Sequence, residues 1–285
     1  MFDKVKYKFF SDKLNPFLYR VIPPTILIIF VLLIWEIVVR SFGIPDYVVP
    51  SWGQVISVLF QDPIFFLQNT VITLAEAFSG FLLGMTFSIF LAFLMVHNDL
   101  LERSIYPIAL MVKVTPIVAI APLIVIWLGF GYSPKIFITF LITFFPVLVN
   151  ALTGFKSIDN NIHRFFIILN ASKWEVFIKL RWQTSIPYLF SAFKISIPLS
   201  VIGAVVAEWF TGNSGLGSII LVSNNELQTP TLFAAILLLA LIGCFLTFLT
   251  NFLEKKIIFW EDYLSLIHIS EPTRRTPISY AVFCL

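Results

Sequence analysis

Long apolar stretches alternate with short polar ones along this chain of 285 residues. The stretches at 26–39 and 231–249 approach the length of about 20 residues that a helix needs to cross the hydrocarbon core of a membrane. The pattern predicts an all-α fold, a polytopic bundle of six membrane-spanning helices. Their expected positions are residues 22–39, 72–96, 110–130, 136–154, 187–209 and 231–252. The first stretch follows a lysine-rich start and is not trailed by a small-residue cleavage site, so we interpret it as a retained span.

The most informative polar segment, residues 155–186, lies between two of these spans and has the pattern of two short helices. Asp159 is placed to cap the first, because its carboxylate can accept hydrogen bonds from the free backbone N–H groups there. The first helix ends at Asn170, and asparagine tolerates the left-handed conformation in which helices often end. Ser172 is followed three residues later by Glu175, which is the spacing of a capping box at the start of the second helix.

The second helix of this loop carries an aromatic and basic face. Trp174, Phe177 and Arg181 follow one another at steps of three and four residues, so they share one side of the helix. A face of this kind is suited to docking into a partner protein. The alternative is an amphipathic helix that lies on the membrane surface, and the spacing alone favours neither.

Basic residues gather in alternate polar segments, and this asymmetry predicts the orientation in the membrane. With the N-terminus inside, the inner segments hold Lys4, Lys6, Lys8, Lys13, Arg20, Arg103, Lys156, Arg164, Lys173, Lys179, Arg181, Lys255 and Lys256. The outer segments hold only Arg40 and Lys135. We therefore expect both termini and the long loop to be cytoplasmic. The chain divides into a cytoplasmic N-terminal segment, 1–21, and a transmembrane domain, 22–264.

Composition argues against several functions. Charged residues make up 12% of the chain, about half the share in a typical soluble domain. The net charge of +3 is explained by topology and is too small to indicate a nucleic-acid partner. The phosphate-loop pattern GxxxxGK[ST] is absent, so ATP cannot bind through such a loop. His, Cys and carboxylate residues show no metal-ligand spacing, and we expect neither catalysis nor a cofactor in this chain.

The last residues, 265–285, differ in character from the rest of the chain. Lysine outnumbers arginine before this point, but the segment holds Arg274 and Arg275 and no lysine. It also resembles a peptide that recurs at the ends of unrelated environmental sequences, as translated adapter sequence would. We interpret the segment as a non-native tail, with a short native terminus as the alternative.

Six motifs occur in a characteristic order along the chain. They are WEIVVRSFGIPDYVVPSWGQV at 35–55, VTPIVAIAPLIVIWLGFG at 114–131, FFPVLVNALTGFKSID at 144–159, AEWFTGNSGLGSII at 207–220, FAAILLLALIG at 233–243 and LEKKIIFW at 253–260. In this order they resemble the permease subunit of a bacterial binding-protein-dependent ABC importer, within the nitrate, sulfonate and taurine group. The resemblance implies the permease fold of a type I ABC importer in the bacterial plasma (inner) membrane.

In this family the cytoplasmic loop docks on a separate ATP-hydrolysing subunit, which uses ATP and Mg²⁺. The resemblance therefore favours docking, and the residues expected to carry it are Arg164, Asn170, Ala171, Ser172, Trp174, Glu175, Phe177 and Arg181. The loop departs from the family pattern, because Arg164-Phe165-Phe166 replaces Glu-Ala-Ala and Asn170 replaces glycine. Since Arg164 reverses a charge at the expected contact, we expect the ATPase partner to carry an acidic residue there.

The resemblance also implies a translocation path between two permease copies, most simply a homodimer, and an extracytoplasmic solute-binding protein that delivers the solute. Candidate path residues lie in the proline-containing third and fifth spans: Lys113, Thr115, Pro116, Lys194, Ser196, Ser200 and Glu208. Lysines at such depths also reach the interface by snorkelling, and small residues also serve helix packing. Glu208 precedes the outer turn at 212–217 and is equally a gate, a loop anchor or a solute contact.

The solute expected by resemblance is a sulfonate, nitrate, taurine or similar anion, although the group also includes carriers of neutral pyrimidine compounds. The main alternative is a secondary transporter or channel that acts without an ATPase. That class usually shows repeated spans or intramembrane carboxylate relays, and neither is visible in the sequence. A membrane-embedded enzyme is disfavoured by the lack of a catalytic cluster.

Overall fold

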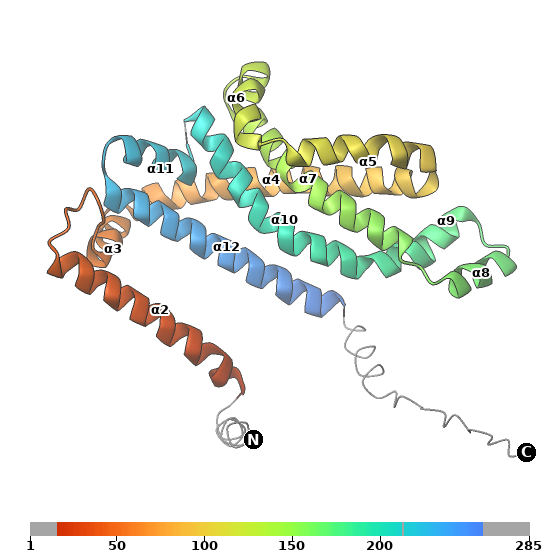
Figure 1. Ribbon diagram of the computed structural model, residues 1–285, viewed down its shortest axis with the longest axis horizontal. Helices are drawn as coiled ribbons and strands as arrows, with labels where there is room; N and C mark the ends of the chain where they lie inside the picture. The colour runs from red at the N-terminus through yellow and green to blue at the C-terminus, as the bar shows by residue number, and fades with distance from the viewer. Residues whose placement is uncertain (1–15, 213, 259–285) are drawn as a thin grey trace, which may run out of the picture.

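The computed structural model describes residues 16–212 and 214–258, with side chains from residue 22 onward. In that part of the chain every regular element is a helix (Figure 1). The helices are α2 (Pro16–Ser41), α3 (Trp52–Gln61), α4 (Pro63–His97), α5 (Asp99–Val114), α6 (Ile117–Leu128), α7 (Tyr132–Lys156), α8 (Asn160–Ile168), α9 (Lys173–Val176), the π-helical turn η1 (Phe177–Arg181), α10 (Trp182–Thr211), α11 (Leu216–Asn225) and α12 (Thr229–Ile257). The expected non-native tail at 265–285 lies outside the described residues.

The helical membrane bundle is confirmed, with two differences in detail. Among the described residues, five helices are long and apolar enough to cross a membrane, and the bent pair α5–α6 makes a sixth when counted as one span. The first, second, fourth and sixth expected spans correspond to α2, α4, α7 and α12, each longer than expected. The third and fifth spans differ from the expectation.

The third expected span, 110–130, is not one helix. α5 and α6 meet at Thr115 and Pro116 with a bend of 101°. Thr115 is extended, with φ −73° and ψ 125°, because the ring of a following proline disfavours the helical conformation in the residue before it. α5 lies along α4, and α6 turns away from it (Figure 1). The kink expected at Pro116 is therefore a complete break between two helices.

The fifth expected span, 187–209, is part of a much longer helix. α9, η1 and α10 form a continuous run of 39 residues, Lys173–Thr211. The second helix expected in the loop 155–186 is thus the N-terminal end of this span and not a separate element. Pro187 and Pro198 lie inside α10 without ending it. A movement at the cytoplasmic loop can consequently be transmitted along one helix to the outer side of the membrane.

The core of the bundle is formed by α4, α7 and α10, which cross closely because small residues meet at their contacts. Thr139 of α7 is buried between Gly80 of α4 and Gly203 of α10. A methyl group on Gly80 would collide with the Thr139 side chain, and one on Gly203 would lie 3.0 Å from the Thr139 Cα. These three helices therefore provide a close-packed frame for polar groups at their outer ends.

Helix α2 stands apart from this frame (Figure 1), and only 6% of its most apolar window is buried. Its outer end is fixed to the bundle by two side chains. Trp35 Nε1 donates to the Pro50 carbonyl at 3.0 Å, and Glu36 accepts from the Trp52 amide at 2.8 Å. The remaining apolar surface of α2 is available to lipid or to a neighbouring subunit.

Candidate functional site

The local structure of the cytoplasmic loop agrees with its sequence pattern. Asp159 Oδ1 accepts from the Asn161 amide at 2.6 Å and caps α8. Asn170 has a φ of 55°, the left-handed conformation expected after the first helix. Ser172 and Glu175 form the expected capping box, with Glu175 Oε2 accepting from the Ser172 amide at 2.9 Å. These contacts fix the turn between α8 and α9.

Helix α8 has no buried residue, although it is amphipathic. Its large apolar side chains are exposed, as is Leu169 just after it: Ile162, Phe165, Ile167, Ile168 and Leu169. Ile168 is 80% exposed. Arg164 is exposed on the same helix. Most of the apolar surface of α8 is thus exposed in the described part of the chain, as expected for a surface that another molecule covers.

The expected docking face on the second helix is divided by the structure. Trp174 is 60% exposed, whereas Phe177 is only 7% exposed. The Phe177 ring packs against Phe93 of α4 at 4.7 Å and against Phe155 of α7 at 5.1 Å. Arg181 also turns inward, because its Nη1 donates to the Phe155 carbonyl at 2.7 Å. Trp174 is therefore available to a partner, whereas Phe177 and Arg181 attach the helix to the bundle.

The candidate path residues on α5 and α10 lie in different surroundings. Lys113 Nζ lies 4.8 Å from the centre of the Phe145 ring. Thr115 donates to the Met111 carbonyl of its own helix at 2.8 Å, and both Thr115 and Pro116 are exposed at the α5–α6 break. Lys194 forms an ion pair with Glu254 of α12 at 2.5 Å. Both candidate lysines therefore already have partners within the subunit.

Two candidate serines lie deeper in α10. Ser196 is fully buried, and its Oγ has no hydrogen-bond partner in the described part of the chain. Ser200 lines a cavity of 510 Å³ between α4, α10 and α12. The walls of this cavity are mainly aromatic and aliphatic, and four phenylalanines contribute to them: Phe78, Phe81, Phe190 and Phe193. Lys113, Thr115 and Pro116 do not belong to its lining.

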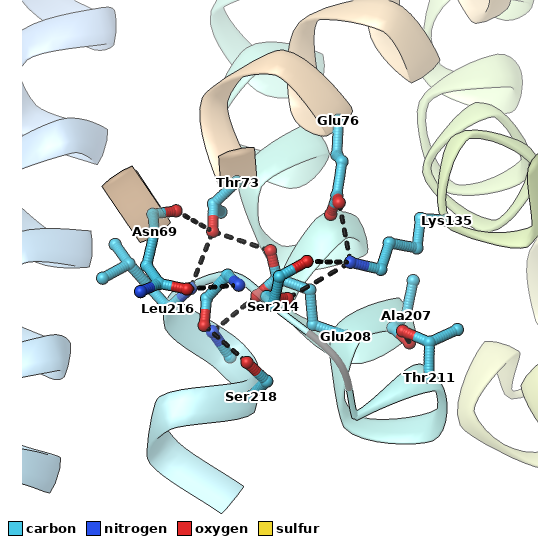
Figure 2. Close-up of polar contacts among 12 residues, drawn as sticks. Asn69, Thr73, Glu76, Lys135, Ala207, Glu208, Thr211, Ser214, Leu216 and Ser218 are labelled. Atoms are coloured by element: carbon cyan, nitrogen blue, oxygen red, sulfur yellow. Dashed lines mark hydrogen bonds and ion pairs between the residues drawn. The ribbon is translucent and has the colours of Figure 1, made fainter. Parts of the chain in front are cut away.

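A buried polar cluster joins the outer ends of the three central helices (Figure 2). Lys135 of α7 is 3% exposed, and its Nζ lies 2.7 Å from Glu76 Oε1 of α4. The same ammonium group donates to the Ser214 carbonyl at 3.2 Å. The sequence places Lys135 in an outer polar segment. The structure has it in the first turn of α7 with its side chain buried, where Glu76 neutralises its charge.

Glu208 of α10 occupies the other half of the cluster and is fully buried. Its Oε1 accepts from Thr73 Oγ1 at 2.7 Å, and its Oε2 accepts from the Gly217 amide at 2.5 Å. Thr73 Oγ1 accepts in turn from the Leu216 amide at 2.8 Å. The amides of residues 216 and 217 belong to the first turn of α11, where N–H groups lack intrahelical acceptors. Glu208 therefore serves as the anchor of this helix.

The loop before α11 is held by the same cluster. Asn69 Oδ1 accepts from the Gly215 amide at 2.8 Å. Gly215 has a φ of 102°, which favours glycine, and a Cβ there would overlap the Glu208 carboxylate. We name this cluster the outer latch: Asn69, Thr73, Glu76, Lys135, Glu208 and the loop residues 214–217. It connects α11 to α4, α7 and α10 at once (Figure 2).

Sequence reasoning singled out Glu208 but missed its partners in the latch. Asn69 and Thr73 are ordinary polar residues near the start of a span and carry no distinctive signal. Glu76 and Lys135 did carry one, because two opposite charges in apolar surroundings each require compensation. Pairing them across the 59 positions that separate them would have predicted the contact.

Comparison with known proteins places this architecture in a family. Residues 84–259 match the family model described as "Binding-protein-dependent transport system inner membrane component". The chain is 34% identical to the formylaminopyrimidine transport permease protein ThiX of Halalkalibacterium halodurans, over 79% of this chain and 90% of the relative. It is 31% identical to the riboflavin transport system permease protein RibX of Chloroflexus aurantiacus, over 84% of this chain and 90% of the relative.

A third relative belongs to the group that the motifs resemble. The chain is 26% identical to the putative aliphatic sulfonates transport permease protein SsuC of Bacillus subtilis, over 81% of this chain and 85% of the relative. The family expected from the six motifs is thereby confirmed. The chain belongs to the inner membrane components of binding-protein-dependent transport systems and is a permease subunit of an ABC importer.

Proposed function

We propose that this permease couples the import of a small solute to ATP hydrolysis in a separate ATP-binding subunit, which docks on α8 and Trp174. The observation that carries this proposal is the exposed apolar surface of α8, a helix in which no residue is buried in the described subunit. ATP and Mg²⁺ would be bound by the partner and not by this chain. Docking would cover Ile168 and Phe165, and the long helix that begins at Lys173 would transmit the motion across the membrane.

The orientation follows from the distribution of charge. Two basic residues are assigned to the outer segments, Arg40 and Lys135. Lys135 is buried, so only Arg40 of these two lies at the surface. Arg40 is itself paired with Glu36, its Nε lying 2.6 Å from Glu36 Oε1. The basic residues of the chain thus remain concentrated on the side of α8. We place α8 and both termini in the cytoplasm, and α11 with the outer latch on the opposite side of the bacterial inner membrane.

The second permease copy and the binding protein complete the transporter. We infer a homodimer with the solute path between two copies, because a single subunit exposes most of the apolar surface of α2 and of the α5–α6 break. An extracytoplasmic solute-binding protein would deliver its ligand to the outer segments near 40–70 and 210–230. In this arrangement the outer latch makes α11 move together with the central helices when the path opens.

For the solute we favour a small planar heterocycle over an inorganic anion. The lysines that would attract an anion are engaged, Lys194 by Glu254 and Lys113 by the Phe145 ring. The cavity between α4, α10 and α12 offers phenylalanine rings and the Ser200 hydroxyl, which suit an uncharged ring with a few polar atoms. ThiX is named for formylaminopyrimidine, a compound of this class. Sulfonate, nitrate and taurine remain the alternative, since SsuC is named for aliphatic sulfonates.

Replacing Ile168 with aspartate should weaken retention of the ATP-binding subunit by about 30-fold, which corresponds to the roughly 2 kcal/mol carried by a central interface residue. Trp174→Asp should act in the same direction. Ile168 is 80% exposed, so membrane insertion of Ile168→Asp should be unaffected. Trp174→Asp also removes the stacking of Trp174 on Phe177, at 6.0 Å between ring centres, so its insertion is measured alongside. Retention is measured by co-purification in mild detergent, and ATP-driven uptake is measured in cells.

The matched control is Asn161→Asp, which adds the same charge on the same exposed helix but close to its N-terminus, where a negative charge is favourable. It should retain the ATP-binding subunit. Phe177→Asp is unsuitable for this test, because Phe177 is buried and its replacement would disrupt the bundle. Normal retention and uptake with Ile168→Asp would show that α8 is not the docking element.

A further inference from the structure

Basic side chains gather around a small cavity at the cytoplasmic end of the bundle. The cavity has a volume of 270 Å³ and lies where α4, α8 and the start of the long helix meet. Four of its eight lining residues are basic: His97, His163, Lys173 and Arg181. The other four are Val96, Ile167, Ala171 and Val176, so the lining contains no carboxylate. His97 and His163, which look isolated in the sequence, thus share one site.

The positive charge of this cavity is not balanced within the described subunit. Of the carboxylates in the adjoining segments, Glu102 pairs with Lys156 at 2.5 Å, and Glu175 pairs with Lys179 at 3.3 Å. Asp99, two residues after His97, is exposed and lies outside the lining. Asp159 caps α8. Within the described residues no ion pair joins Lys173 or Arg181 to a carboxylate. Like charges held close together raise the electrostatic energy unless an opposite charge joins them.

We propose that this basic cavity receives an acidic side chain of the ATP-binding subunit. The proposal rests on the proposed function, because α8 supplies both the docking surface and two lining residues of the cavity, His163 and Ile167. The volume lies below the roughly 300–1,000 Å³ of typical small-molecule pockets, so it suits a single side chain. Arg164, which follows His163 on α8, is exposed and adds a further positive charge to this helix.

The charge arrangement explains why the loop departs from the family pattern. Where Glu-Ala-Ala is expected, this chain has Arg164-Phe165-Phe166, so it offers positive charge and apolar surface together. The complementary partner offers a carboxylate and an apolar groove. Such a pair favours the correct ATP-binding subunit over one that presents a basic residue there, because like charges at an interface are repulsive.

The ATP-binding subunit encoded by the neighbouring gene is co-expressed with the full-length permease. The test measures how much of it the permease retains in mild detergent. Lys173→Glu reverses one charge of the cavity at the first position of α9, where an acidic residue favours the helix. We expect the apparent affinity of the Lys173→Glu permease for the ATP-binding subunit to fall about tenfold or more at low salt. In about 1 M salt, where the screening length is about 3 Å, wild type and variant should converge.

The matched control is Lys179→Glu, the same charge reversal on the same helix but outside the lining of the cavity. Its affinity should stay within about twofold of wild type, as is usual for exposed ion pairs. An Asp→Lys or Glu→Lys scan of the ATP-binding subunit should contain one variant that restores binding to Lys173→Glu. That rescue would identify the acidic residue. Arg181 is not substituted in this test, because its side chain also donates a hydrogen bond to the Phe155 carbonyl.

The outcomes separate the two proposals. Equal retention by wild type and Lys173→Glu at low salt would overturn the cavity proposal alone. Unchanged retention combined with a lower affinity of Lys173→Glu for phosphatidylglycerol vesicles would assign the cavity to a lipid headgroup and would also overturn it. If the wild-type chain does not retain the ATP-binding subunit, the proposed function fails, and the cavity proposal fails with it.

Discussion

Replacing Lys135 with methionine should destabilise the permease by about 3–5 kcal/mol, because it leaves the Glu76 carboxylate buried without its partner. Glu76 is 1% exposed, and its Oε2 already has no hydrogen-bond partner in the described region. Loss of the 2.7 Å contact would deprive Oε1 of its donor as well. For a protein of this size the melting temperature in detergent should fall by about 6–20 °C.

The double variant Glu76→Leu with Lys135→Met is the control, because removing both charges of a buried pair is often neutral. It should recover most of the lost stability and should show that the single variant suffers from an uncompensated charge. Lys256→Met, at the exposed cytoplasmic end of α12, should have no measurable effect. A single Lys135→Met variant that melts like wild type would contradict the burial of this ion pair.

Replacing Glu208 with alanine should abolish uptake by releasing α11 from the central helices. The change leaves the Gly217 amide and the Thr73 hydroxyl without their acceptor, and each such buried group costs about 1–3 kcal/mol. Among the described residues of α4 and α7, Asn69, Thr73 and Lys135 would still hold the loop 214–217. Uptake is measured in cells and normalised to the amount of membrane-inserted permease.

Two further variants distinguish release of the loop 214–217 from a general loss of folding of the permease. Glu226→Ala removes an exposed carboxylate at the other end of α11 and should transport normally. Gly217→Ala keeps Glu208 but places a methyl group 2.6 Å from Glu208 Oε2 and 2.7 Å from the Val205 carbonyl. It should therefore lower uptake as Glu208→Ala does. Full uptake by Glu208→Ala would mean that the latch plays no part in opening the path.

The parts of this structure that the sequence predicts best depend on neighbours three or four residues apart. Asp159, Asn170 and the Ser172–Glu175 pair adopt their expected conformations, because helix capping is decided by groups within one turn. The positions of four of the six spans were predictable for a similar reason, since apolar length is a property of single segments.

Contacts between distant segments were less predictable. The pattern placed Phe177 on one face with Trp174, and the two rings do stack at 6.0 Å, but Phe93 of α4 and Phe155 of α7 cover Phe177. The π-helical turn η1 begins at Phe177 and shifts the register of Arg181 beyond it. A π-helical turn of this kind rotates the residues after it relative to those before it, and spacing alone does not reveal it. The break at Thr115 was signalled by Pro116, but its angle is set by packing in three dimensions.

The most direct test of the account is reconstitution of the purified full-length chain in lipid vesicles, with and without the ATP-binding and solute-binding proteins encoded beside it. Solute uptake is expected only when both partners and ATP are present, and Ile168→Asp should abolish that uptake. Uptake by the chain alone, without ATP or an ATP-binding partner, would contradict the account and would establish a secondary transporter or channel.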